Sequence, residues 1–113
     1  MWWKGYPAEE AGKEETVMPT YISLVNWTDQ GIRNIKETLP RADRSAELAQ
    51  KHGGSLQLYW TVGPYDLVSI FEAPDDESAT AYLLEVGMGG AVRTTTLRAY
   101  DREEMSSILG RLG

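Results

Sequence analysis

The residues that could carry chemistry in this sequence lie at alternate positions along four stretches typical of β-strands. Aromatic rings, hydroxyls and one guanidinium recur at every second position, and a strand places such positions on one face of a sheet. A mostly apolar face with a few polar groups is typical of a small-molecule pocket. The candidate ligand-binding residues are Tyr21, Ser23, Trp27, Tyr59, Thr61, Thr96 and Arg98, with Tyr65 and Asp66 of a turn.

Arg98 gives this candidate face its charge. Arg93 and Arg98 point to opposite faces of one strand because their separation is odd, and alternation assigns Arg98 to the aromatic face. An unpaired buried charge is costly, so Arg98 must meet a small acidic or phenolic ligand or an acidic residue of a partner subunit. In an enzyme, the aromatic residues and Arg98 would orient a substrate and stabilise an enolate-like anion. We then expect Arg98→Ala to abolish activity.

Other reactive side chains have structural interpretations. His52 is the single histidine and precedes Gly53 and Gly54, where a helix C-terminus favours a partly positive ring. With one histidine and no cysteine we expect no metal site and no bound cofactor. The acidic run at 75–77 is typical of a helix N-terminus. The segment GPYD at 63–66 is typical of a turn; alternatively, its phenol and carboxylate lie at the mouth of the cavity.

The elements that must position these residues follow the order β-α-β-β-α-β, with a further C-terminal helix. Strands are expected at 20–27, 54–62, 67–73 and 91–100, where β-branched and aromatic residues alternate with others. Apolar residues at helical spacing occupy 28–52, interrupted at Pro40, and 74–90. Asp101 and Glu104 have the spacing of a capping box. This order predicts a ferredoxin-like α+β fold, with one antiparallel four-stranded sheet and both main helices on one face.

Alternation also predicts which face of this sheet the helices cover. The aromatic and hydroxyl set falls on the open face. Exposing Tyr21, Tyr59 and Phe71 together would leave a large apolar patch, so we expect a homodimer or a higher homo-oligomer with a cavity between two sheets. Alternatively, the hydroxyls bond across strands and no cavity exists; a register error of one residue would exchange the faces. The helix-covered face is expected to hold Ile22, Leu24, Leu56, Leu58, Trp60, Val62, Val68, Ile70, Leu97 and Ala99.

Composition excludes several classes of protein. A chain of 113 residues with 42% hydrophobic residues predicts one globular domain. A net charge of −6 argues against nucleic acid as a partner, because phosphates require a basic face. The sequence has no apolar run long enough for a membrane span and no visible signal peptide, so we expect no membrane partner and a cytoplasmic protein.

The first 17 residues differ from the rest. Residues 1–17 lack apolar periodicity and are expected to form a flexible N-terminal extension, with the domain at 18–113. Trp2, Trp3 and Tyr6 are residue types that anchor interfaces, so this tail could dock onto a protein partner. Two alternatives remain: the tail covers an apolar patch on its own oligomer, or translation starts at Met18.

Several ordered blocks of the sequence resemble the GYD-domain family. They are MPTYISLVNWTDQGI at 18–32, LPRA at 39–42, GPYD at 63–66 continued by LVSIFEAPDDESA, and VRTTTLRAYDREE at 92–104. The resemblance covers residues 18 to about 105. It implies a ferredoxin-like fold of the dimeric α+β barrel group, found in small bacterial proteins, and it brings no established activity.

Three functions therefore remain open. The first is a homo-oligomer that binds a small molecule or serves as an accessory or regulatory subunit. The second, suggested by enzymes of the dimeric α+β barrel group, is a cofactor-independent oxygenase or isomerase acting on a small aromatic or dicarbonyl compound. The third is an interaction module that docks through its aromatic tail. We favour the first, because no nucleophile–base pair is visible in the sequence.

Overall fold

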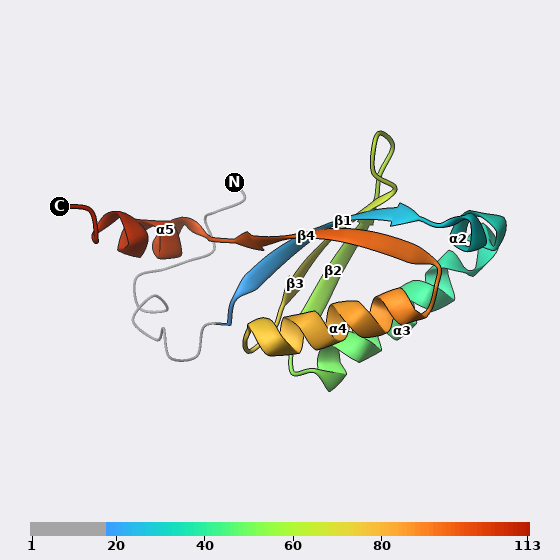
Figure 1. Cartoon of the computed structure of the whole chain (residues 1–113), viewed down its shortest axis with the longest axis horizontal. Helices are drawn as coiled ribbons and strands as arrows, with labels where there is room; N and C mark the ends of the chain where they lie inside the picture. Colours follow the sequence, from blue (N-terminus) through green and yellow to red (C-terminus); the bar gives the residue numbers. More distant parts are fainter. Residues whose placement is uncertain (1–17) are drawn as a thin grey trace. The chain divides into compact units, whose positions relative to one another are not determined.

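The computed structural model describes residues 18–113, and its element order confirms the predicted fold. Helices α3 and α4 run along one face of a single four-stranded sheet (Figure 1). Residues 18–98 form one compact unit, and residues 99–113 belong to a second unit. The elements are β1 (Thr20–Trp27), α2 (Asp29–Arg33), the 3-10 helix η2 (Ile35–Glu37), α3 (Thr38–Lys51), β2 (Ser55–Trp60), β3 (Leu67–Glu72), α4 (Asp76–Met88), β4 (Val92–Ala99) and α5 (Arg102–Leu109).

The sheet has the strand order β2-β3-β1-β4 and is antiparallel. Strands β2 and β3 form the predicted hairpin, and the chain crosses over the sheet through α3 and through α4. Phe71 on β3 lies opposite Tyr21 on β1 and Leu56 on β2, so these three side chains share one face. This is the ferredoxin-like arrangement that the order of elements predicted.

The helix boundaries follow local capping rules. The Thr28 hydroxyl accepts a hydrogen bond from the Gly31 N–H, and the Asp75 carboxylate accepts one from the Ser78 N–H. Pro40 lies in the first turn of α3, where a helix does not need its missing N–H. The predicted capping box of α5 is confirmed, since Asp101 and Glu104 each accept a bond from the other's N–H.

The predicted face assignment is wrong for β1, β3 and β4. For β2 it is correct at Leu56 and Leu58, whereas Val62 lies beyond the end of the strand and is fully exposed. Tyr21 and Phe71 are buried in the core beneath α3 and α4. Leu56 and Leu58 share that face, as predicted. Both faces of β1 and β3 carry apolar residues, so alternation alone does not distinguish them, and the aromatic set offers the larger area to bury. The helix-covered face holds Tyr21, Ser23, Val25, Leu67, Ser69, Phe71, Thr94 and Thr96.

The opposite face of the sheet is also apolar. Tyr59 is 55% exposed and Leu97 is 49% exposed, and both lie on the side away from α3 and α4. Ile22 and Val68 beside them are half-buried. An apolar open face therefore still favours a homodimer through the sheet, although most of the residues on this face are not the ones predicted. None of the helices within residues 18–113 is long and apolar enough to cross a membrane.

Candidate functional site

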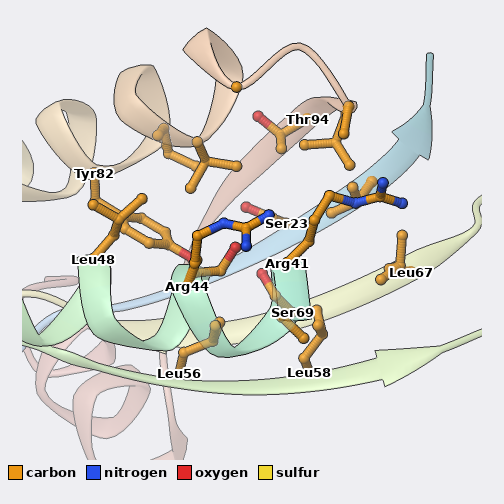
Figure 2. Close-up of a pocket in the computed structure, with 18 of the residues that line it drawn as sticks. Ser23, Arg41, Arg44, Leu48, Leu56, Leu58, Leu67, Ser69, Tyr82 and Thr94 are labelled. Atoms are coloured by element: carbon orange, nitrogen blue, oxygen red, sulfur yellow. The ribbon is translucent and has the colours of Figure 1, made fainter. Parts of the chain in front are cut away.

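A pocket of about 550 Å³ lies between the sheet and helices α3 and α4 (Figure 2). This volume is in the range of small-molecule sites, roughly 300–1,000 Å³. Its floor is formed by the covered face of the sheet, and its walls by the facing sides of the two helices. The side chains that define it include Ser23, Leu56, Leu58, Leu67 and Ser69 of the floor, Arg41, Arg44 and Leu48 of α3, and Tyr82, Leu83 and Val86 of α4.

Two serines lie side by side in the floor of the pocket. Ser23 on β1 and Ser69 on β3 are cross-strand partners and are both almost fully buried. The Ser23 hydroxyl forms a hydrogen bond of 2.7 Å with the Thr96 hydroxyl. The Ser69 hydroxyl has no hydrogen-bond partner among residues 18–113, and Figure 2 shows it pointing into the pocket. One floor hydroxyl is thus satisfied, and its neighbour is available to a ligand.

This difference predicts opposite responses to removal of the two hydroxyls. Ser23→Ala leaves the Thr96 hydroxyl without its partner, and we expect a loss of about 1 kcal/mol in the free energy of unfolding. Ser69→Ala removes a group with no partner and should leave that free energy unchanged or slightly higher. Urea unfolding of both variants measures the difference. Equal losses would contradict the assignment of the two hydroxyls.

Tyr82 of α4 places a second available hydroxyl at the pocket. The residue is 5% exposed, and its ring packs against Phe71 with centroids 4.9 Å apart. Its hydroxyl has no hydrogen-bond partner in the described part of the chain. Burial raises the pKa of Tyr82 to about 12, so the phenol stays protonated at neutral pH. Tyr82 can therefore donate a hydrogen bond to a ligand oxygen.

Two arginines of α3 face the same space. Arg41 donates to the carbonyl oxygens of Asn34 at 3.0 Å and Gly31 at 3.3 Å, which fixes its guanidinium beside the pocket. Arg44 lies one turn further along, is exposed, and forms no ion pair or hydrogen bond with the other described residues. Because exposed Arg44 is also a lining residue, the pocket opens to the surface along α3. The guanidinium groups of Arg41 and Arg44 give this opening its positive charge.

The far end of α3 is tied to α4 by a small charged cluster. Glu85 lies 3.0 Å from Lys51 Nζ and 2.5 Å from His52 Nε2. The hydrogen bond with His52, and then that with Lys51, hold the pKa of Glu85 below its ordinary value. Within residues 18–113, no group of three or more histidines or acidic residues is arranged to hold a metal ion. The cluster thus joins two walls of the pocket.

The Glu85 contacts predict a stability change in acid. A carboxylate whose pKa is lowered by folding contributes stability above its unfolded value, near 4.5, and loses that contribution as pH falls through the folded value. We expect the Tm of the wild type to fall more steeply than that of Glu85→Gln between about pH 6 and about pH 3. Glu47→Gln is the matched control on α3 and should keep most of the wild-type slope. Parallel curves for the wild type and Glu85→Gln would contradict the role of this cluster.

The predicted site residues lie in different parts of the domain and do not form one site. Ser23 and Trp27 line the pocket, and Thr96 is hydrogen-bonded to Ser23. Tyr21 lies in the core, where its phenol donates to Asp76. Arg98 lies 5.6 Å above the Tyr21 ring and is not a lining residue of the pocket. Tyr59 lies on the open face of the sheet.

The remaining predicted residues belong to the turn between β2 and β3. The Thr61 hydroxyl donates to the Tyr65 carbonyl at 2.7 Å, and the Asp66 carboxylate accepts from the Trp27 N–H at 2.9 Å. These bonds support the structural interpretation, in which the GPYD segment is a turn. The turn connects the hairpin to the end of β1 by hydrogen bonds. Trp2, Trp3 and Tyr6 lie outside the described residues.

Several residues of the pocket were not predicted from the sequence. Arg41, Arg44 and Leu48 follow a spacing of three and four, which places them on one side of a helix. That spacing was a usable signal. The sequence shows no partner for His52, whereas in the structure it contacts Glu85, 33 residues further along the chain. No local pattern indicates such a contact.

Comparisons with known proteins agree with this architecture. The family described as the GYD domain matches residues 21–109. A relative from Thermus thermophilus, named "Glutamine synthetase and cystathionine beta-lyase binding protein", is 33% identical over 84 residues, which are 73% of this chain and 88% of that protein.

Two solved structures are similar to this chain. One, also from Thermus thermophilus, is 26% identical with a TM-score of 0.48, and the match covers 75% of this chain and all of that one. The other is a putative chlorite dismutase, 11% identical with a TM-score of 0.54. That match covers 82% of this chain and 48% of the dismutase, and it concerns the fold alone.

Proposed function

Because this chain belongs to the GYD domain family, we propose that it is an accessory protein that binds a small molecule and associates with a partner enzyme. The observation that carries the proposal is the pocket of about 550 Å³, whose floor includes a serine hydroxyl with no partner among the described residues. An apolar cavity with a few convergent polar groups is the usual form of a small-molecule site.

The side chains around the pocket support binding over catalysis. A nucleophilic hydroxyl needs a base within hydrogen-bonding reach. Ser23 is bonded to Thr96, and Ser69 has no such base among the residues that the structure describes. The carboxylate of Glu85 contacts Lys51 and His52, and neither serine hydroxyl of the floor is bonded to it. These contacts suit a site that holds a molecule without transforming it.

The name of the Thermus relative supports a protein partner. That relative is named for binding glutamine synthetase and cystathionine beta-lyase, and this chain covers 88% of its length. We propose that this chain likewise binds a metabolic enzyme.

The open face of the sheet supports a homodimer as the functional unit. Tyr59, Leu97 and their half-buried neighbours form an apolar patch on this face, and exposed apolar patches commonly mark interaction surfaces. We expect Leu97→Glu to convert the dimer to a monomer, because a carboxylate would be buried without a partner. Leu84→Glu, on an exposed position of α4, is the matched control and should keep the dimer. A monomeric wild type would contradict this assembly.

Two measurements test the proposed function as a whole. Native mass spectrometry of the protein purified gently from its own host should show a dimer, or a multiple of it, with reproducible extra mass. The purified full-length chain should also bind glutamine synthetase or cystathionine beta-lyase of the same organism, measured by surface plasmon resonance. Absence of both extra mass and enzyme binding would overturn the proposal.

An isomerase or cofactor-independent oxygenase is the second candidate, and the contact between His52 and Glu85 favours it. A histidine paired with a carboxylate can act as a general base, and Glu85 lines the pocket. Phenylpyruvate, an aromatic oxo acid, is a suitable first substrate, with its tautomerisation followed by ultraviolet absorbance. Saturable turnover that disappears in His52→Gln would favour this candidate over the accessory role.

A further inference from the structure

The geometry points to an amphipathic carboxylate as the ligand of the pocket, with its anionic head on Arg44 and its apolar body between the leucines of the floor and of α3. This inference rests on the proposed binding function and adds the chemical class of the ligand. Three independent features of the pocket carry it: its charge, its unpartnered hydroxyls and its apolar walls.

The first feature is an excess of positive charge in an acidic protein. The chain has a net charge of −6, yet three of the five charged residues that line the pocket are basic. Lys51 is neutralised by Glu85. The Arg41 guanidinium is held by two carbonyl oxygens, which leave its charge uncompensated. Arg44 makes no ion pair with any described residue, so an anion would find it available.

The second feature is a pair of hydroxyls on nearly buried side chains. Ser69 and Tyr82 are both 5% exposed, line the pocket, and have no hydrogen-bond partner for their hydroxyls among residues 18–113. Every fully enclosed side-chain nitrogen or oxygen in this part of the chain has a partner, so these two hydroxyls open onto the pocket. They come from different elements, β3 and α4, and both face the same space (Figure 2). An apolar ligand would bury both hydroxyls without a hydrogen-bond partner. The oxygen atoms of a carboxylate can instead accept hydrogen bonds from them.

The third feature is the apolar surface that remains uncovered inside the pocket. Leu56 and Leu58 lie on the helix-covered face of the sheet but are only half-buried. Leu48 of α3 and Val86 of α4 face them and are half-buried as well. An aliphatic or aromatic body would cover these side chains, whereas inorganic phosphate would leave them exposed. The combination therefore selects an acid with an apolar tail over a small inorganic anion.

The test compares two probes of equal length and different charge. The full-length protein is titrated by isothermal calorimetry with decanoate, below its micelle concentration, and separately with decanamide. Both carry the same tail and a carbonyl oxygen, and only decanoate is charged. We expect decanoate to bind at least about tenfold more tightly, because a hydrogen bond between ionised partners is about twice as strong as a neutral one.

Four variants locate the binding. Arg44→Gln should weaken decanoate at least about tenfold and leave decanamide unchanged, since the charge–charge contact is lost. Ser69→Ala should weaken both probes several-fold. Arg33→Gln removes the same charge from an exposed position of α2 outside the pocket and should leave both affinities unchanged. Circular dichroism and thermal melting establish that each variant is folded, and Arg44→Lys should restore part of the affinity for decanoate.

The outcomes separate this inference from the proposed function. Equal affinities for decanoate and decanamide would overturn the inference, as would an affinity for decanoate that Arg44→Gln does not change or that Arg33→Gln weakens equally. Failure of both probes to bind, while the protein from its own host carries extra mass, would overturn the carboxylate and leave the small-molecule function standing. Failure of both probes together with the absence of extra mass and of enzyme binding would overturn both.

Discussion

Phe71→Ala is expected to lower the free energy of unfolding by about 3–5 kcal/mol. Phe71 is 1% exposed and is among the largest fully buried side chains of the described residues. Its ring stacks on Tyr21 at 5.0 Å and contacts Tyr82 at 4.9 Å, so its loss opens a cavity at the centre of the core. A domain of this size is stable by about 5–15 kcal/mol in total. We therefore expect the variant to be marginally folded at 37 °C.

Urea unfolding followed by circular dichroism measures this loss. Tyr59→Ala is the control, because Tyr59 is an aromatic residue on the open face with 55% exposure. Because Tyr59 lies on the proposed dimer face, both variants are compared in the monomeric Leu97→Glu background, where the effect of Tyr59→Ala should be well below that of Phe71→Ala. Since Phe71 supports the ring of Tyr82, we also expect the folded fraction of Phe71→Ala to bind decanoate more weakly. A loss below about 1.5 kcal/mol for Phe71→Ala would contradict its central place in the core.

Gly31→Ala is expected to cost about 3 kcal/mol, the upper end of the range for overpacking. A Cβ at this position would lie 2.0 Å from the carbonyl oxygen of Ala91, which is backbone and has no rotamer to adopt. The chain therefore has to separate α2 from the start of β4. Arg41 donates to the Gly31 carbonyl, and Ala91 lines the pocket, so the same movement should disturb one end of the pocket.

Gly87→Ala is the matched control for this close approach. Gly87 lies inside α4, and a Cβ there would meet nothing within 4 Å. Alanine is favoured over glycine in helices, so we expect a gain of about 0.5–1 kcal/mol. Thermal unfolding of the two variants gives shifts of opposite sign if the contact between Gly31 and Ala91 is as close as the structure shows. A Gly31→Ala variant as stable as the wild type would contradict that contact.

The proposed carboxylate site and the proposed dimer face lie on different parts of the molecule. The pocket involves α3, α4 and the covered face of the sheet, whereas the proposed homodimer involves the opposite face. Variants of Arg44 and of Leu97 can therefore be measured independently. A loss of enzyme binding in Leu97→Glu with decanoate affinity intact would assign partner recognition to the assembled dimer.

Much of the architecture was determined by local sequence rules. The alternation at 20–27, the turn residues at 63–66 and the capping box beginning at Asp101 each depend on neighbours within a few positions. Such signals act through backbone geometry and short-range hydrogen bonds, which the chain carries wherever it folds. The order of elements followed from them, and the order sufficed to predict the ferredoxin-like fold.

Only the tertiary structure decided which face of each strand is covered and where the pocket lies. Along β1, both Ile22 and Tyr21 can contribute to a core, and their burial depends on the helix that crosses above them. The pocket exists because α3 and α4 leave space above Ser23 and Ser69, and its positive charge comes from Arg41 and Arg44 on a helix rather than from Arg98 on a strand. The contact of His52 with Glu85 spans 33 residues. Contacts at such separation depend on how packed elements lie in space, and local residue patterns do not encode that arrangement.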